Sequence, residues 1–362
     1  MLCVSSLVYR VRSAVLRPSL AIFLALMATT IGAQTGQGQP LVVNEDVLEQ
    51  RLRETGFEPP EKFKALVGIV EAGAEESRCE RWFDWAGTST DRDDWWPAST
   101  VKLYAAIAAL QRNRRMGFRP RARLLFNYSD EEPVERTLRE IVRRAIIRSD
   151  NHAFNRLVEY AGFNWINQRF FVSRNGLQGT VFLRAYNSHR LDPETGYGVN
   201  RASPPIMVRS QSRERLIPAR VGRGEFSCPE QGNCTTLRSL ADAIRRVMLH
   251  EELPAEQRFR VGPRELRVLR GALEAPRREH GRLLVESIRR GFGGDESVRV
   301  YHKPGFAYQW SSEVMAVHQE STGRWFFISA AAWPGRRSLD DGLERIARLL
   351  AGDGFGGEVS CD

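Results

Sequence analysis

The chain has 362 residues, of which 42% are hydrophobic and 27% are charged, a composition typical of folded globular proteins. Lys and Arg (53) outnumber Asp and Glu (44), so the formal net charge is +9. The arginines are spread through segments with helical periodicity, and no zinc-finger or RNA-binding signature is present. The charge therefore indicates an anionic environment, such as a cell envelope, rather than a nucleic-acid-binding protein.

The first 33 residues predict a secretory signal peptide. Arg10, Arg12 and Arg17 precede the apolar stretch SLAIFLALMATTIGA, which ends in small residues and suggests cleavage near Ala33. This stretch is short compared with the roughly 20 apolar residues of a membrane-spanning helix. We therefore expect an exported protein, periplasmic or extracellular, with no membrane span after cleavage. An uncleaved membrane anchor is the alternative.

Four cysteines follow this leader, an even number that suggests disulfides in an exported chain. Cys228 and Cys234 flank the turn-rich segment PEQGN, which would let them pair. Cys79 would then pair with Cys361, although four thiols allow three pairings. A zinc site is a weak alternative, because no histidine stands near these cysteines at ligand spacing. We expect no metal and no cofactor.

Hydrophobic periodicity divides the remaining chain into a polar linker (34–44), one domain (45–352) and a short tail (353–362). The pattern predicts a helix over 44–56, strands over 64–73 and 79–87, three further strands over 297–305, 311–319 and 324–333, and a closing helix over 339–352. Between them, residues from about 99 to 290 are predicted to be mainly helical, with helices over 99–115, 133–148, 152–161, 164–171, 236–250 and 263–275. The terminal strands would form one antiparallel sheet flanked by the first and last helices. The helical lobe would then be inserted between strands, which leaves a cleft between the two.

The segment 95–110, WWPASTVKLYAAIAAL, places Ser99 and Lys102 at the start of a mostly apolar helix. Residues three apart lie on one face of a helix, so the lysine amine can reach the serine hydroxyl. A lysine desolvated by apolar neighbours has a lowered pKa and can remove the serine proton. The spacing therefore predicts a nucleophile and its base.

Two other short motifs carry polar groups that suit the same chemistry. Residues 149–151 (Ser-Asp-Asn) lie in the break between two predicted helices and offer Ser149 as a proton relay and Asn151 as a substrate amide partner. Residues 303–305 (Lys-Pro-Gly) end a predicted strand and offer a cation, Lys303, together with a glycine that allows close backbone approach. Each motif is weak alone, but their order in one exported chain is informative.

Taken together, these motifs resemble the serine β-lactamase and penicillin-binding protein superfamily, whose signatures are Ser-x-x-Lys, Ser-Asp-Asn and Lys-Thr-Gly. The class A β-lactamases are the branch most similar to this chain, through PASTVKL, KPGFAYQWSSEVMAV and TTLRSLADAIRRVM, over roughly residues 60 to 352. The resemblance implies an α+β, β-lactamase/transpeptidase-like fold with an all-helical inserted lobe, and a monomer. It also implies that Ser99 is acylated, Lys102 accepts its proton and Ser149 relays protons. Asn151, Lys303 and Gly305 would bind substrate, and the backbone N–H groups of Ser99 and Ala307 would form the oxyanion hole.

The chain departs from the family pattern at two positions. Pro304 replaces a hydroxyl residue of the third motif, a loss for which Ser311 or Ser312 could compensate. The family's deacylating glutamate has no clear counterpart: one alignment places Asn187 there, and another brings Glu194 close to it. An asparagine cannot deprotonate water, so the acyl-enzyme would be long-lived if Asn187 holds this position.

These observations predict an exported serine hydrolase that forms an acyl-enzyme, with β-lactamase-like hydrolysis of β-lactams as the favoured activity. The alternatives are a penicillin-binding protein or D-Ala-D-Ala peptidase acting on peptidoglycan peptides, and an inactive relative that only binds the cell envelope. The doubtful glutamate position favours the peptidase, whereas the single-domain layout favours the lactamase.

Overall fold

The computed structural model describes residues 43–44, 46–72, 78–171, 175–177, 179–187, 198, 200–229, 232–276, 283–352 and 354–355. These residues belong to one compact unit that begins at Gln37. The predicted signal peptide, Glu194 and Cys361 lie outside the described residues. Within the described part of the chain, no helix combines the length and apolarity needed to span a membrane.

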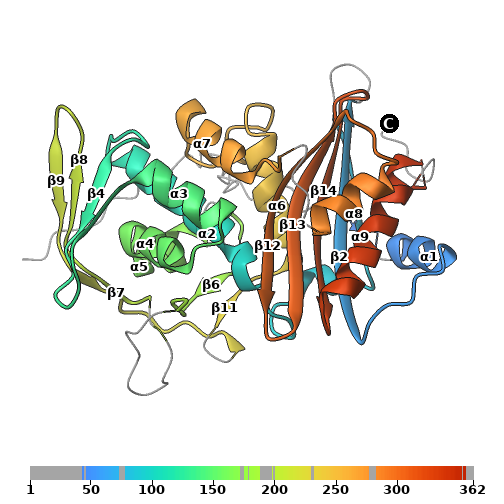
Figure 1. The fold of residues 1–362 in the computed structure, drawn as a ribbon, viewed down its shortest axis with the longest axis horizontal. Coiled ribbons are helices and arrows are strands. Elements are labelled where there is room, and N and C mark those ends of the chain that lie inside the picture. The colour runs from blue at the N-terminus through green and yellow to red at the C-terminus, as the bar shows by residue number, and fades with distance from the viewer. Residues whose placement is uncertain are drawn as a thin grey trace, which may run out of the picture. The chain divides into compact units, whose positions relative to one another are not determined.

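The largest sheet of the described residues has six strands, in the order β1-β3-β2-β14-β13-β12 (Figure 1). Its strands are β1 (Val43–Asn44), β2 (Lys62–Ala72), β3 (Arg78–Asp84), β12 (Val298–Ala307), β13 (Trp310–Gln319) and β14 (Arg324–Trp333). All neighbours pair antiparallel except β1 and β3. The first and last segments of the domain therefore meet in one sheet, as the sequence predicted, and β12 lies at an edge of this sheet.

Alternating side chains divide the core between the two faces of this sheet. Val67 and Ile69 face one cluster with helices α1 (Val47–Glu54), α8 (Leu283–Gly291) and α9 (Arg336–Ala351), whereas Leu66 and Val70 face the other. Helix α6 (Leu237–Met248) lies against the second face (Figure 1). Helix α8 was not predicted.

The inserted lobe contains the remaining helices. A 3₁₀ helix, η3 (Ala98–Val101), leads into α2 (Lys102–Arg115), which is followed by α3 (Leu138–Ile147), α4 (Asn151–Ala161), α5 (Phe163–Trp165), the π-helical turn η4 (Ile166–Phe170) and α7 (Pro263–Leu273). A further 3₁₀ turn, η2 (Thr88–Thr90), follows β3. Helix α2 runs through the centre of this lobe, and all its residues from Lys102 to Leu110 are buried.

The lobe also holds strands, so the expectation of an all-helical insertion is wrong in this respect. Strands β4 (Arg123–Phe126), β5 (Val134–Thr137), β8 (Ile206–Arg209) and β9 (Glu214–Ile217) form a four-stranded antiparallel sheet. Two small sheets pair β6 (Val181–Phe182) with β11 (Asn233–Cys234), and β7 (Ala202–Ser203) with β10 (Arg220–Val221). The helix predicted from residue 133 begins only at Leu138, because Thr137 and Glu140 form a capping box there.

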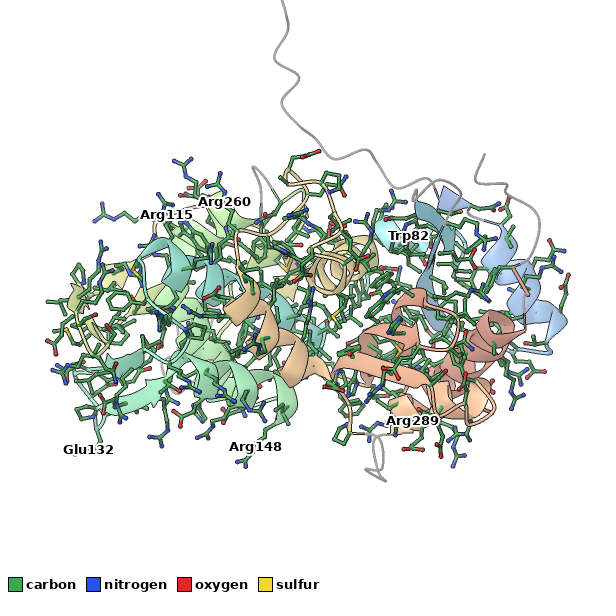
Figure 2. All side chains as sticks on the ribbon, turned by 90° about the horizontal axis from the view of Figure 1, so that it is seen from above. Trp82, Arg115, Glu132, Arg148, Arg260 and Arg289 are labelled. Carbon is green, nitrogen blue, oxygen red and sulfur yellow. A yellow bond between two sulfur atoms is a disulfide. The ribbon has the colours of Figure 1, made fainter. Side chains whose placement is uncertain are left out.

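Gly68 on β2 faces Trp82 on β3, a side chain that is labelled in Figure 2 and is only 2% exposed. A methyl group at position 68 would lie 2.6 Å from carbons of the indole ring. Gly68→Ala should therefore lower the free energy of unfolding by about 1–3 kcal/mol, the usual cost of overpacking a core. Urea denaturation measures this change.

The control is Gly271→Ala in α7, where a methyl group would meet no atom of the described residues within 4 Å. In a helix this change should be stabilising by about 0.5–1 kcal/mol. Unchanged stability of the Gly68→Ala variant would contradict the packing of Trp82 described above.

Candidate active site

The amine of Lys102 lies at the centre of the candidate site. The residue is fully buried at the start of α2, yet its Nζ reaches three acceptors on the α3–α4 turn. It donates to the Ser149 carbonyl oxygen (2.5 Å), to Asn151 Oδ1 (2.6 Å) and to Ser149 Oγ (3.2 Å). An ammonium has three N–H donors, so all three are satisfied in this arrangement.

Burial lowers the pKa of Lys102 to about 8, and the nearby Asp150 carboxylate opposes this shift by favouring the charged amine. Two other groups bind the Asp150 carboxylate. It accepts the Ala153 backbone N–H as the N-cap of α4 (2.9 Å) and binds the Arg144 guanidinium (2.7 Å). Lys102 is therefore cationic at neutral pH but loses its proton more readily than a lysine in water.

Ser149 lies between two lysines. Its Oγ is 3.2 Å from Lys102 Nζ and 3.0 Å from Lys303 Nζ, and Lys303 is also fully buried. Lysine amines in the ammonium form only donate, so the serine oxygen accepts from both. The hydroxyl proton of Ser149 is then available to a third group. The backbone of Ser149 has φ 52°, a left-handed conformation that is uncommon outside glycine.

Ser99 lies on η3, three residues before Lys102, and is partly exposed. Strand β12 passes close to its backbone, as Gly305 shows. A Cβ atom at position 305 would lie 2.9 Å from the Ser99 backbone nitrogen and 2.6 Å from the Pro97 carbonyl oxygen. Only glycine allows this approach, which brings the edge strand β12 beside the candidate nucleophile.

The neighbouring strand β13 also contacts the residues that precede Ser99. Ser312, which pairs with Gly305 in the sheet, donates from Oγ to the Pro97 carbonyl oxygen (3.0 Å). Its hydroxyl is therefore engaged in positioning the residues before Ser99. Pro304, at the position of the expected hydroxyl residue, contributes its carbonyl oxygen, which accepts from Lys303 Nζ (2.7 Å). Ala307, the expected oxyanion-hole residue, lies two residues beyond Gly305 at the end of β12, where Trp310 is its partner on β13.

Sequence reasoning did not assign Tyr186 to the site. Its hydroxyl donates to the Ala98 carbonyl oxygen (2.9 Å), and its ring centroid lies 5.7 Å from Lys102 Nζ. Burial raises the pKa of Tyr186 to about 12, so the phenol is neutral. Ala98 itself has φ 47°, which makes it a second strained residue next to the nucleophile. Tyr186 belongs to the segment LRAYN (183–187), in which the sequence indicates only the next residue, Asn187, as a candidate.

Of the two residues predicted for the deacylating position, Asn187 belongs to the described residues. Asn187 is exposed and has φ 48°, one residue beyond Tyr186. Glu194 lies outside the described residues. Asn155 fixes this loop from α4, because its amide exchanges two hydrogen bonds with the backbone of Tyr186 (2.8 and 2.9 Å). Within the described part of this loop, Tyr186 is thus the residue that contacts Ala98 and lies over Lys102.

The disulfide between Cys228 and Cys234 is present, as the sequence suggested. Cys79 is also disulfide-bonded, and its expected partner Cys361 lies outside the described residues. Cys228 and Cys234 line a pocket of about 240 Å³ that also includes Trp96, Tyr308 and Trp310. Trp96 and Tyr308 are close in sequence to Ser99 and Ala307, so two segments of the candidate site also contribute to the lining of this pocket.

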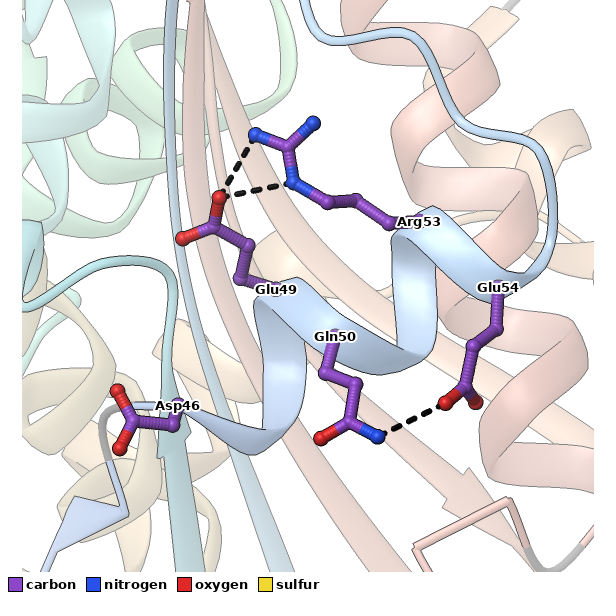
Figure 3. Close-up of a pocket in the computed structure, with 5 residues that line it drawn as sticks. All are labelled: Asp46, Glu49, Gln50, Arg53 and Glu54. Carbon is purple, nitrogen blue, oxygen red and sulfur yellow. Dashed lines mark hydrogen bonds and ion pairs between the residues drawn. The ribbon is translucent and has the colours of Figure 1, made fainter.

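A second pocket is lined by none of the motif residues. Residues of α1 and the preceding turn line it, and four of them form two pairs along the helix (Figure 3). Arg53 binds Glu49 (2.7 Å), and Gln50 donates to Glu54 (2.9 Å). The described residues also contain no group of three or more His, Cys, Asp or Glu side chains that could hold a metal ion.

Comparisons with solved structures define the class of fold. The chain is similar to PBP-A, with a TM-score of 0.55 at 16% sequence identity over 87% of this chain and 98% of that chain. It is also similar to a point mutant of PBP-A in an acyl-enzyme complex with penicillin G (TM-score 0.52, 16% identity, 86% and 97% covered). The ancestral class A β-lactamase of Gram-negative bacteria gives a TM-score of 0.53 at 17% identity, with 85% and 100% covered. The fold is therefore the α+β fold shared by class A β-lactamases and PBP-A, as predicted.

A match to a family model identifies the protein family within this class of fold. The model of the β-lactamase enzyme family matches residues 88–351, which include every motif described above. The chain therefore belongs to the β-lactamase enzyme family, and the resemblance found in the sequence is confirmed. This membership supports a serine hydrolase of the β-lactamase or penicillin-binding type. A search of curated protein sequences finds no match to this chain.

The environment of Lys102 predicts its titration. The chain has four lysines, so selective ¹³C-lysine labelling gives a simple NMR spectrum, in which the Lys102 signal is identified by its loss in Lys102→Met. This signal should titrate with a pKa of about 8. In Asp150→Asn the pKa should fall further, because the neighbouring negative charge is removed. A pKa above 10 in the native protein would show that the amine is not desolvated.

Proposed function

We propose that the protein is an exported serine hydrolase that is acylated at Ser99 by β-lactams and by the peptide amides that they mimic, and that it releases the acyl group slowly. The observation that carries this proposal is the cluster of Lys102, Ser149 and Lys303 beside Ser99, built from three separate segments of the chain. Membership of the β-lactamase enzyme family supports the same chemistry.

We infer the following path for the proton, in which the contact between Lys102 and Ser149 supports the second transfer. The neutral form of Lys102 accepts the Ser99 proton while Ser99 Oγ attacks the carbonyl carbon of the substrate amide. As the C–N bond breaks, the leaving nitrogen takes a proton from the Ser149 hydroxyl. Lys102 returns its proton to Ser149 across the 3.2 Å contact. One proton thus moves from Ser99 to the leaving nitrogen, and Lys102 ends the step neutral.

The charge that develops on the carbonyl oxygen needs donors that are already in place. We assign this role to the backbone N–H groups of Ser99 and Ala307, which the edge strand β12 brings to the same side of the site through the close approach at Gly305. Lys303, buried and bonded to Ser149, supplies a positive charge for a substrate carboxylate. Asn151, already an acceptor for Lys102, would contact the substrate amide with its side-chain N–H.

Slow release is favoured by the groups around Lys102. In the described part of the chain, its contacts are a hydroxyl, an amide oxygen, a carbonyl oxygen and the ring of Tyr186, and none is a carboxylate. A hydrolytic water therefore lacks an evident carboxylate base there. This arrangement favours a penicillin-binding type of activity over rapid β-lactam hydrolysis, which would need a base such as Glu194.

Export is part of the proposal. It is supported by the charged, apolar and small-residue order of residues 1–33 and by the Cys228–Cys234 disulfide, which suits an oxidising compartment. We assign the protein to the periplasm or the extracellular side of the envelope.

Intact-mass spectrometry of the protein mixed with penicillin G, sampled from seconds to hours, tests the function. The native chain should gain one penicillin mass and keep it for many minutes, and Ser99→Ala should gain none. Ser210→Ala is the matched control, because Ser210 is exposed in the β8–β9 turn, and it should be acylated like the native chain.

The other outcomes separate the alternatives. A brief adduct with accumulating hydrolysed drug would contradict slow release and would establish a β-lactamase. Labelling that persists in Ser99→Ala would contradict the assignment of the nucleophile. No adduct on any variant would contradict the whole proposal and leave the envelope-binding alternative.

A further inference from the structure

The four-stranded sheet of the inserted lobe ends in strand β9. Among the described strands β9 pairs only with β8, and Figure 1 shows both at the end of the inserted lobe away from β12, β13 and β14. We use the name "β9 edge" for residues 213–221, which run from the start of β9 to β10. This edge plays no part in the acylation chemistry proposed above.

The β9 edge carries two exposed aliphatic side chains. Leu216 is 58% exposed and Val221 is 72% exposed, whereas the alternate residue Ile217 is buried in the core. Leu216 lies opposite Met207 on β8, and Met207 lies opposite Leu125 on β4, both partly exposed. The outer face of the sheet therefore carries a continuous row of aliphatic side chains that ends at the β9 edge.

The β9 edge also carries exposed basic side chains. Arg213 and Arg215 are exposed, and Arg213 packs over the ring of Phe118 at 4.8 Å. Arg112, near the end of α2, interacts electrostatically with both Arg215 and Arg115, the latter of which extends outward in Figure 2. Burial lowers the pKa of Arg112, and the charges of Arg115 and Arg215 lower it further. Within the described residues, the buried Arg112 Nε has no hydrogen-bond partner.

Charged residues are also distributed unevenly along the whole chain. Residues 99–276 contain 31 Lys and Arg against 18 Asp and Glu, whereas the rest of the chain contains 22 against 26. The lobe that carries the β9 edge is thus positive, and the remainder of the chain is slightly negative. Guanidinium groups that repel one another at a surface are stabilised by a ligand that brings negative charge.

We propose that the β9 edge binds the surface of an anionic phospholipid bilayer, with Arg213, Arg215 and Arg115 contacting lipid phosphates while Leu216 and Val221 enter the boundary between headgroups and acyl chains. Cationic groups beside exposed aliphatic side chains are the combination that such an interface binds. An anionic polymer in solution would account for the arginines but would leave the aliphatic row exposed. Pairing with a second copy is disfavoured, because the charged residues of the edge strand β9 and Pro218 directly after it oppose strand addition.

Sedimentation with lipid vesicles tests this inference on the full chain. The probes are vesicles of phosphatidylcholine with phosphatidylglycerol, and vesicles of phosphatidylcholine alone. The native chain should bind the anionic vesicles more tightly, and added salt should weaken this binding. Arg213→Gln/Arg215→Gln should weaken binding to anionic vesicles by about tenfold or more. Leu216→Ser/Val221→Ser should weaken it clearly as well.

Arg336→Gln/Arg337→Gln is the matched control, because it removes the same charge from two exposed positions at the start of α9. It should bind like the native chain. Arg213 also donates to the Gly117 carbonyl oxygen, so Arg215→Gln alone is the variant that avoids loosening that turn. Residues 1–33 are identical in every variant, so differences between variants report on the β9 edge. Circular dichroism checks that each variant is folded.

Four results would overturn the inference. The first is equal binding of the native chain to both kinds of vesicle, and the second is equal binding of anionic vesicles by the arginine variants and the α9 control. The third is binding of Leu216→Ser/Val221→Ser that is as tight as that of the native chain. The fourth is a concentration-dependent dimer that these substitutions dissociate, with no vesicle binding. The third result would indicate attraction to any anionic polymer, and the fourth would indicate a second copy of the chain.

Discussion

The buried amine of Lys102 is the constraint on which the site depends. A lysine at the start of an otherwise apolar helix needs acceptors, and the α3–α4 turn supplies three of them through Ser149 and Asn151. Lowering the pKa from 10.5 to about 8 corresponds to a cost on the order of 3 kcal/mol for keeping the amine charged. This cost makes the proton easy to lose, which is the property that a base for Ser99 requires. The same contacts hold two helices together beside the nucleophile.

Strained backbone conformations and the close backbone approach at Gly305 hold these groups in position. Ala98 and Ser149 both have positive φ, and each lies next to a group used in the proposed chemistry. Tyr186 and Ser312 hold the residues before Ser99 through the Ala98 and Pro97 carbonyl oxygens. Gly305 lets the edge strand pass without a side chain. The site is therefore positioned by contacts from four segments rather than by the Ser-x-x-Lys motif alone.

Much of this arrangement could be predicted because the motifs are local. Ser99 and Lys102 share a helix start, and Lys303 and Gly305 share a strand, so spacing alone indicates their relation. Tyr186 could not be predicted, because its contact with Ala98 joins distant segments and LRAYN has no periodicity that shows where a side chain points. The four-stranded sheet was missed for a similar reason: its strands have only four residues each, and β4 pairs with β8 far along the chain. Such pairings leave little trace in a local pattern.

The central claim is that acylation of Ser99 uses the neutral form of Lys102. The most direct measurement is the rate of acylation by penicillin G as a function of pH, followed by quenched intact-mass spectrometry at low drug concentration. Because only the neutral amine accepts a proton, the rate should rise about tenfold per pH unit and level off above a pKa of about 8. The midpoint should match the Lys102 titration seen by NMR. A rate that is independent of pH from about 6 to about 9, or one that falls across this range, would contradict the account.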